Sequence, residues 1–278
     1  MYLIKTRNLV LDENKIYVMG VLNVTPDSFS DAGEFLDAGK ALDEAIKIQS
    51  QGASILDIGA QSTRPGFKMV DEKTEWKRLK VPLDLIRQKL RIPISVDTFH
   101  PYVALRSIDS GADIINDVTG FKNREMVKIL ARSSASLIVM HDGPLSETRG
   151  FLQSKFDELT KNSQDLVEKE RLCFDPGIGF GKSQEENLAI IKNPLKFSVR
   201  ESFTLVGVSR KRVTSLACQK GALPKERLVP TIASNAVMAV NGAQIIRVHD
   251  VKEGVECAKM SQAIKFCNCA QIKKQKKF

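Results

Sequence analysis

The stretch IYVMGVLN at residues 16–23 decides the fold: it is an apolar run that ends on one polar residue, Asn23. The same pattern recurs in SILDIG (54–59), ISVDT (94–98), DIINDV (113–118), SLIVMHD (136–142), RLCFDPG (171–177), TLVGVS (204–209) and QIIRVHD (244–250). Short apolar runs bounded by turn residues are typical of buried parallel strands. Eight of them predict an α/β fold, a (β/α)8 TIM barrel, with the polar ends gathered on one rim.

Helical patterns separate these strands. We expect helices over residues 38–51, 71–89, 101–110, 124–133, 154–170, 185–192, 211–219, 225–241 and 252–266. Gly52, Gly111, Gly221 and Gly242 follow such segments, where a left-handed residue ends a helix at least steric cost. Residues 1–15 are predicted to form a short hairpin that closes the opposite end of the barrel, residues 16–266 the barrel domain, and residues 267–278 a basic C-terminal tail.

The composition suits a single domain. A chain of 278 residues that is 42% hydrophobic can bury one large core. No apolar stretch approaches the roughly 18 residues that a membrane-spanning helix needs. The segment MYLIKTRNLVLDENK (1–15) lacks the pattern of a signal peptide. We therefore expect a cytoplasmic protein with no membrane partner.

The charge distribution argues against a nucleic-acid-binding protein, and the cysteines argue against a disulfide-linked or metal-binding one. The net charge is +9, but four lysines lie in the final KKQKKF and the rest form no stripe interleaved with aromatic residues. A solvated tail explains this better than a nucleic-acid partner, which we do not expect. The five cysteines are odd in number and form no CxxC pair, which favours free thiols over a disulfide or metal site.

Three loops have the composition of binding loops. NVTPDSFSDAG (23–33) is long and polar, as lids and binding loops are, although a plain connection is the alternative. QSTRPG (61–66) holds an arginine that can fork onto phosphate oxygens, and it is also a good turn. DPGIGFGK (175–182) has three glycines in five residues, which permits close backbone approach to a ligand. Taken alone, none of these loops identifies a ligand.

Together the motifs resemble a known family. The chain contains, in the family's order, NVTPDSFSDAG (23–33), STRPG (62–66), SVDT (95–98), INDV (115–118), DPGIGFGK (175–182), VSRK (208–211) and RVHDV (247–251). This set resembles dihydropteroate synthase of folate biosynthesis over about residues 16–266. The resemblance implies a pterin-binding TIM barrel, a transferase that condenses 7,8-dihydropterin-6-ylmethyl diphosphate with 4-aminobenzoate to give 7,8-dihydropteroate and diphosphate.

The resemblance also implies a pterin site. Its residues would be Asp97, Asn116, Met140, Asp175 and Lys211. A pterin carries an amide-like edge and an amino group, which buried carboxylates and an amide can complement. Lys211 would donate to the carbonyl and N5 region of the ring. Helix capping is the alternative interpretation for the aspartate at 97 and the asparagine at 116.

A diphosphate site follows by the same resemblance, from Asn23, Arg64, Arg247 and His249, with Mg²⁺ held near Asn23. The negative charge that develops on the leaving group is the main electrostatic demand of the reaction. We therefore expect a dissociative, SN1-like substitution, with Lys211, Arg247, His249 and Arg64 as the catalytic residues. In isolation His249 would be interpreted as a core histidine.

The 4-aminobenzoate site is expected to involve aromatic and proline faces and hydroxyl groups, from Phe29, Thr63, Pro65, Phe180 and Ser209. Sulfonamides, as mimics of 4-aminobenzoate, would occupy the same place. Ordered binding, with the pterin diphosphate first, follows if the diphosphate orders the first two loops.

The sequence departs from the family at three places. Gln61 stands where a glutamate is usual, the loop after Met140 is shorter and acidic, and Arg212 follows the Ser-Arg-Lys motif. Two other functions stay open. A methyltetrahydrofolate methyltransferase-like barrel would share the pterin residues but would not need STRPG or RVHDV. A non-catalytic paralogue would bind pterin or a partner protein without turnover.

We expect a homodimer through the helices over 225–241 and 252–266. The family is usually dimeric, and VPTIASNAVMAV (229–240) is apolar beyond a single stripe. A monomer that buries this face against its own strands is the alternative.

Overall fold

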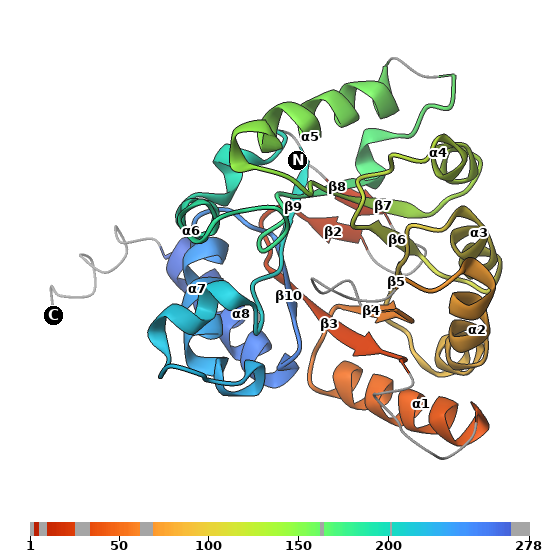
Figure 1. The fold of residues 1–278 in the computed structure, drawn as a ribbon, viewed down its shortest axis with the longest axis horizontal. Coiled ribbons are helices and arrows are strands. Elements are labelled where there is room, and N and C mark those ends of the chain that lie inside the picture. The colour runs from red at the N-terminus through yellow and green to blue at the C-terminus, as the bar shows by residue number, and fades with distance from the viewer. Residues whose placement is uncertain are drawn as a thin grey trace, which may run out of the picture.

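The structure, a computed structural model, describes residues 3–5, 10–25, 34–61, 69–161, 164–200 and 202–267. Within these ranges eight parallel strands form a closed barrel in the order β10-β3-β4-β5-β6-β7-β8-β9 (Figure 1). The strands are β3 (Tyr17–Asn23), β4 (Ile55–Gly59), β5 (Ile94–Asp97), β6 (Ile114–Asp117), β7 (Ser136–Met140), β8 (Leu172–Asp175), β9 (Phe203–Val206) and β10 (Ile245–Val248). The predicted TIM barrel is confirmed.

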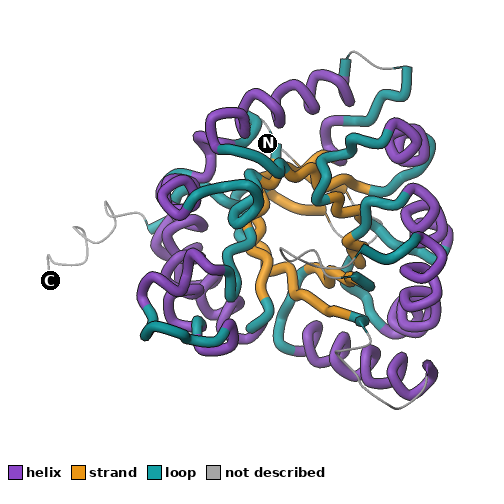
Figure 2. Tube along the Cα trace, viewed as in Figure 1, coloured by secondary structure: helices purple, strands orange, loops and turns teal. Residues whose placement is uncertain are grey.

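An α-helix follows each barrel strand in the chain, and the helices form the outer layer (Figure 2). They are α1 (Glu34–Ser50), α2 (Glu72–Lys89), α3 (Pro101–Asp109), α4 (Arg124–Ala131), α5 (Leu145–Thr160), α6 (Gln184–Lys192), α7 (Leu228–Val240) and α8 (Val251–Lys265). No helix among the described residues is long and apolar enough to cross a bilayer.

Two helical segments differ from the sequence prediction. The helix expected over 154–170 is α5, which begins directly after Pro144 and ends by Lys161. A proline is tolerated there because the first turn has no intrahelical acceptor for its missing N–H. The segment expected as a helix over 211–219 is instead the 3-10 helix η4 (Arg212–Ala217). In η4 the hydroxyl groups of Thr214 and Ser215 donate to carbonyls three residues back and so compete with regular helical bonding.

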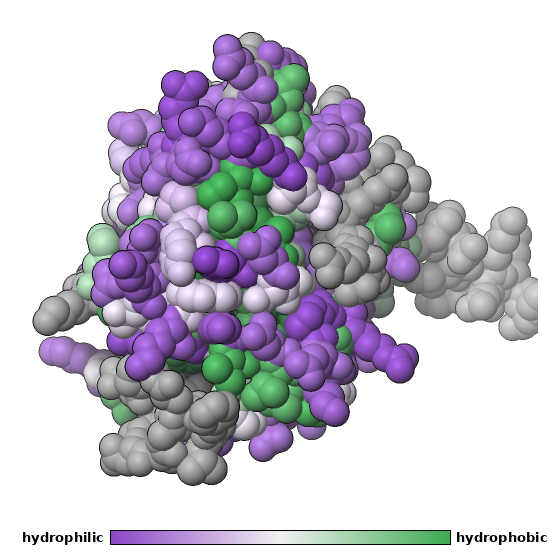
Figure 3. Space-filling model, turned by 90° about the vertical axis from the view of Figure 1, so that its right-hand side faces the viewer, coloured by the Kyte–Doolittle hydropathy of each residue, from purple (hydrophilic) through white to green (hydrophobic). Residues whose placement is uncertain are grey.

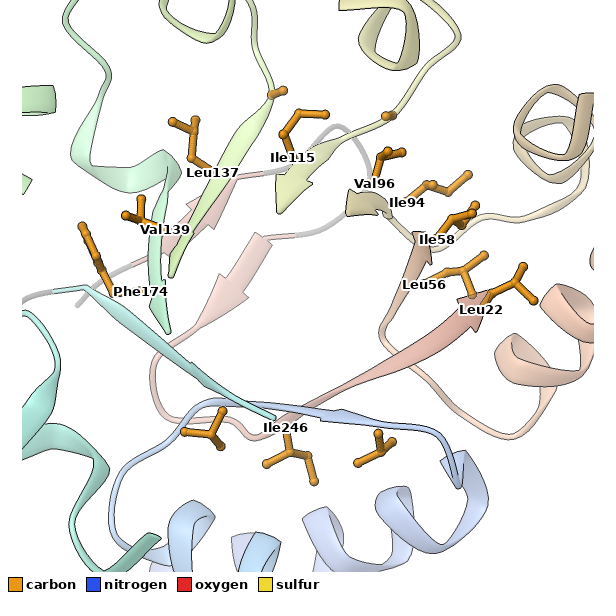
Figure 4. Packing of buried hydrophobic residues seen from close by; sticks show 14 of the residues in the cluster. Leu22, Leu56, Ile58, Ile94, Val96, Ile115, Leu137, Val139, Phe174 and Ile246 are labelled. Atoms are coloured by element: carbon orange, nitrogen blue, oxygen red, sulfur yellow. The ribbon is translucent and has the colours of Figure 1, made fainter. Parts of the chain in front are cut away.

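The main core lies between the barrel and its helices. Side chains alternate across a strand, so Leu56 and Ile58 of β4 share one face, whereas Asp57 faces the other. Figure 4 shows the labelled apolar side chains pointing away from the barrel centre toward the helices. Leu56 and Ile58 are fully buried in this layer. The outer surface on the side of α2 and α3 is mainly hydrophilic, with a narrow band of hydrophobic residues (Figure 3).

A second apolar cluster fills the barrel interior at the end where the strands begin. The predicted N-terminal hairpin is present as β1 (Leu3–Lys5) paired antiparallel with β2 (Val10–Asp12). Leu11 of β2 is fully buried in this cluster. The other members are Tyr17, Met19, Ile55, Ile114, Ile138, Cys173, Phe203, Leu205 and Ile245.

The cysteines described by the structure are free thiols, as expected. Cys173 and Cys257 are buried, Cys218 is half-buried and Cys267 is exposed. The fifth, Cys269, and the rest of the predicted tail from residue 268 lie outside the described residues.

Candidate active site

The strand register brings the predicted polar residues to one rim. Asn23 of β3 lies level with Gly59 of β4, which lies level with Asp97 of β5. Asp97 in turn pairs with Asn116 of β6. On the far side of the barrel, Met140 and Asp175 form the corresponding pair at the ends of β7 and β8. Residues far apart in the sequence, such as Asp57 and Arg247 at 190 positions, therefore meet at the mouth, because all eight strands end there.

Arg247 lies between two carboxylates. Its Nε donates to Asp57 Oδ2 at 2.7 Å, and one terminal nitrogen donates to Asp97 Oδ2 at 3.2 Å. The Asn116 amide contacts the same Asp57 oxygen at 3.5 Å. The predicted diphosphate residue Arg247 and the predicted pterin residue Asp97 thus belong to a single ion-paired group.

Both carboxylates retain hydrogen-bonding capacity. Among the described residues, no hydrogen-bond partner reaches Asp57 Oδ1 or Asp97 Oδ1, although both atoms are buried. Buried polar atoms without a partner are costly, so these two oxygens at the barrel mouth are suited to accept hydrogen bonds from a polar ligand. Burial, assisted by the charge of Asp57, raises the pKa of Asp97 to about 7.

Lys211 provides a cation on the opposite side of the mouth. Its Nζ donates to the Ile178 carbonyl at 2.6 Å and lies 4.6 Å from the centre of the Phe180 ring. Burial lowers the pKa of Lys211 to about 8, against the raising effect of Asp175. The structure therefore brings together the predicted pterin residue Lys211 and the predicted 4-aminobenzoate residue Phe180.

The loop after β8 depends on glycine. Gly177 has φ +76°, and a Cβ there would lie 1.9 Å from the His141 carbonyl oxygen. Only a residue without a side chain allows this approach. The Gly177 N–H donates to Asp175 Oδ1 at 2.7 Å and so fixes the orientation of that carboxylate.

Ser209 and His249 lie together at the ends of the strands β9 and β10. The Ser209 hydroxyl accepts from the His249 N–H at 3.2 Å and lies 3.0 Å from its Nδ1. Next to them, the Arg210 guanidinium forms a two-point ion pair with Asp250. A predicted 4-aminobenzoate residue and a predicted diphosphate residue therefore share one hydrogen-bonded group.

Four predicted site residues, Phe29, Thr63, Arg64 and Pro65, lie outside the described residues. Two fully buried acids, Asp57 and Glu75, were not among the predicted site residues. The signal for Asp57 was present, since it is the one charge in the apolar run SILDIG. Helix capping by Asp97 and Asn116 does not occur: both lie on strands, and His100 is the N-cap of α3.

Chemically, the mouth offers acceptors on one side and a cation on the other. The free oxygens of Asp57 and Asp97, with the Asn116 amide, suit a flat polar heterocycle that presents N–H groups. Lys211 suits its carbonyl or an adjacent anion.

Comparisons with known proteins agree with this chemistry. A family model described as pterin binding enzyme matches residues 19–249. A dihydropteroate synthase from Clostridium beijerinckii is 36% identical over 257 residues, which cover 90% of this chain and 94% of that protein. The chain therefore belongs to the pterin binding enzyme family.

Two solved structures narrow the class of enzyme within this family. Xanthomonas albilineans dihydropteroate synthase with 4-aminobenzoic acid has a TM-score of 0.88 and 30% identity, covering 96% of this chain and 99% of that one. Yersinia pestis dihydropteroate synthase with a sulfonamide drug complex has a TM-score of 0.86 and 32% identity, covering 95% and 100%. Within the family, this chain groups with the dihydropteroate synthases, which are transferases.

Proposed function

We propose that the chain condenses 7,8-dihydropterin-6-ylmethyl diphosphate with 4-aminobenzoate, forming 7,8-dihydropteroate and releasing diphosphate. The observation that carries this proposal is that Asp57 Oδ1 and Asp97 Oδ1 have no hydrogen-bond partner among the described residues, at a barrel mouth that also holds Lys211. A pterin ring presents N–H donors to such oxygens and a carbonyl to such a cation. Family membership over residues 19–249 supports the same substrate class.

The mechanism we propose is dissociative. Loss of diphosphate leaves a cationic pterin methylene, which the arylamine nitrogen of 4-aminobenzoate then attacks. Asp97, Asn116 and Asp175 bind and orient the pterin, and Lys211 binds its carbonyl and N5 region. The protein contributes orientation and charge stabilisation, and no covalent bond to an enzyme nucleophile is needed.

Arg247 has two parts in this proposal. Its ion pairs with Asp57 and Asp97 keep both carboxylates in place for the pterin. Its positive charge, with Arg64 and His249, also favours the departing diphosphate. Because Arg247 lies in the same ion-paired group as the pterin carboxylates, pterin binding and diphosphate binding are expected to be coupled.

Mg²⁺ fits the residues present. The described residues contain no group of three or more acidic, histidine or cysteine side chains that would hold a metal by themselves. Mg²⁺ is usually bound through few protein oxygens together with substrate phosphates. The Asn23 side-chain oxygen, at the end of β3, would hold it, and the ion would neutralise charge on the diphosphate.

The second substrate is supported by comparison and by geometry. The Xanthomonas albilineans relative was solved with 4-aminobenzoic acid. Here the Phe180 ring offers an aromatic face and Ser209 a hydroxyl group beside His249. Because the Yersinia pestis relative was solved with a sulfonamide drug, we propose that sulfonamides compete with 4-aminobenzoate in this chain.

We also propose a homodimer through α7 and α8. These helices pack side by side and leave large apolar side chains exposed: Val229 by 78%, Met260 by 63% and Ile264 by 52%. Sedimentation of the wild type and of Met260→Glu tests this, with a monomeric wild type as the contradicting result. A cytoplasmic location stays a prediction.

The deciding experiment is diphosphate release by purified protein with both substrates and Mg²⁺, run beside Lys211→Ala and the exposed-lysine control Lys220→Ala. Release that requires 4-aminobenzoate and is lost only in Lys211→Ala supports the synthase. Saturable pterin binding without release would favour the non-catalytic paralogue instead.

A further inference from the structure

Helix α2 has one acid on its buried face. Glu75 is fully buried in line with Leu79, Leu83 and Ile86, which are also fully buried. A carboxylate taken out of water is costly unless hydrogen bonds hold it. Nothing in the proposed reaction has yet used Glu75, so its partners decide what it does.

The partners of Glu75 come from the ends of two neighbouring strands. Gln61, just beyond β4, donates from Nε2 to Glu75 Oε2 at 3.3 Å. Thr98, just beyond β5, lies beside the same carboxylate and favours its ionised form, whereas Glu75 Oε1 has no hydrogen-bond partner among the described residues. His100 Nε2 lies 3.7 Å from Glu75 Oε2. The Arg78 and Asp97 side chains also act electrostatically on Glu75, Arg78 favouring its ionised form and Asp97 opposing it.

The residues that contact Glu75 are in turn connected to the candidate active site or to the loop that follows β4. Thr98 directly follows Asp97, and its N–H donates to the Asn116 carbonyl at 3.0 Å. Gln61 Oε1 accepts from the Val70 N–H at 3.5 Å, at the limit of a hydrogen bond. His100 Nε2 lies 3.2 Å from the Val70 carbonyl. Glu75 thus contacts Gln61 and His100, which both hydrogen-bond to Val70.

We propose that Glu75 is a positioning residue: its carboxylate lies between Gln61, just beyond β4, and Thr98 and His100, just beyond β5, and so fixes Asp97 for the pterin. The geometry stands by itself, whereas the identity of the ligand rests on the proposed function. Glu75 acts through its neighbours and does not itself contact the substrate.

The amide at position 61 fits this role. Gln61 donates to Glu75 with its nitrogen and accepts from Val70 with its oxygen. A glutamate at 61 offers only acceptors when ionised, so two facing acids would need a proton between them. An amide facing a carboxylate needs no such proton.

The test compares steady-state kinetics of the wild type, Glu75→Gln and the control Glu72→Gln, which removes the same charge from a half-exposed position on the same helix. Glu75→Gln is expected to raise KM for the pterin diphosphate about tenfold, the effect of losing hydrogen bonds to a charged group, with a smaller change in kcat. Unchanged KM in folded Glu75→Gln, or an equal rise in Glu72→Gln, would overturn the proposal.

A double variant tests the pair directly. Gln61→Glu with Glu75→Gln restores one amide facing one carboxylate, and most of the lost pterin affinity is expected to return. A double variant no better than Glu75→Gln would refute the assignment. If Glu75→Gln does not fold, Thr98→Val takes its place, since it removes the hydroxyl beside Asp97 and keeps the side-chain shape. A KM for the pterin diphosphate equal to that of the wild type in Thr98→Val would also overturn the proposal.

Calorimetric binding of the pterin diphosphate without 4-aminobenzoate separates the two proposals. If the wild type binds pterin but does not turn over, the synthase reaction fails, while weaker binding by Glu75→Gln still supports the positioning role. Equal binding by both proteins would count against Glu75 whatever the reaction.

Discussion

The two ends of the barrel are built from the same strands but differ in chemistry. On β4, Ile55 is part of the apolar interior cluster and Asp57, two residues further on the same face, pairs with Arg247. On β10, Ile245 is likewise part of the apolar interior cluster, and Arg247, two residues further along the strand, forms the ion pair with Asp57. At one end apolar side chains fill the barrel, and at the other two buried carboxylates each have an oxygen without a hydrogen-bond partner in the part of the chain that the structure describes. One end therefore stabilises the fold, and the other keeps its hydrogen-bonding capacity for a ligand.

Asp97→Asn changes the mouth of the barrel and is the substitution with the largest expected effect. The variant loses an ionised acceptor for the pterin, so kcat/KM is expected to fall about 100-fold. Because burial raises the pKa of Asp97 to about 7, ionised Asp97 opposes folding above that pH, and the variant should be at least as stable at pH 8. Kinetics and thermal unfolding check this against Asp109→Asn; a large loss of Tm would contradict it.

Leu11→Ala tests the other end. Deleting a fully buried leucine side chain leaves a cavity and should cost about 3 kcal/mol of unfolding free energy. The turnover of the remaining folded protein should not change. Urea unfolding measures the cost, with Val10→Ala, half exposed on the same strand, as the control. A loss of kcat in folded Leu11→Ala would show that the two ends are not independent.

Glu75→Gln tests how the buried acid near the mouth makes the stability of the fold depend on pH. Burial raises the pKa of Glu75 from 4.5 to about 7, so the folded state binds more protons than the unfolded state between these values. Wild-type stability should therefore fall as pH rises from about 4.5 to about 7, by about 3 kcal/mol for this group. The variant should lose that part of the slope. Unfolding at several pH values measures it, and parallel curves would show that Glu75 is not the titrating group.

Asp250→Asn is expected to have the smallest effect. Asp250 forms a two-point ion pair with Arg210, and both side chains are partly exposed. Screening by water limits such a pair to about 1 kcal/mol. Thermal unfolding at low and high salt tests it, since the difference from wild type should shrink with salt. A loss above the Leu11→Ala value would mean that the mouth also stabilises the fold.

The sequence predicted the barrel well because the length, spacing and order of the apolar runs carry that information: each run became a barrel strand, with its polar residue near the end of the strand or within three residues beyond it. It misplaced α5, since Gly150 and several polar residues weaken the helical pattern of the first half. It could not show that Arg247 pairs with Asp57, because that contact joins residues 190 positions apart. Nor could it show that Glu75 faces the strands, since one acid on an amphipathic helix is usually solvated.

Cys173 gives the barrel an internal reporter of its own opening. The thiol is 1% exposed in the interior cluster, and burial raises its pKa, so the reactive thiolate is suppressed while the strands stay paired. In a chain whose other cysteines are replaced, the labelling rate of this thiol would follow how often β7, β8 and β9 separate. Repeating the measurement with a pterin bound at the mouth would show how strongly ligand contacts at one end hold the strands together at the other.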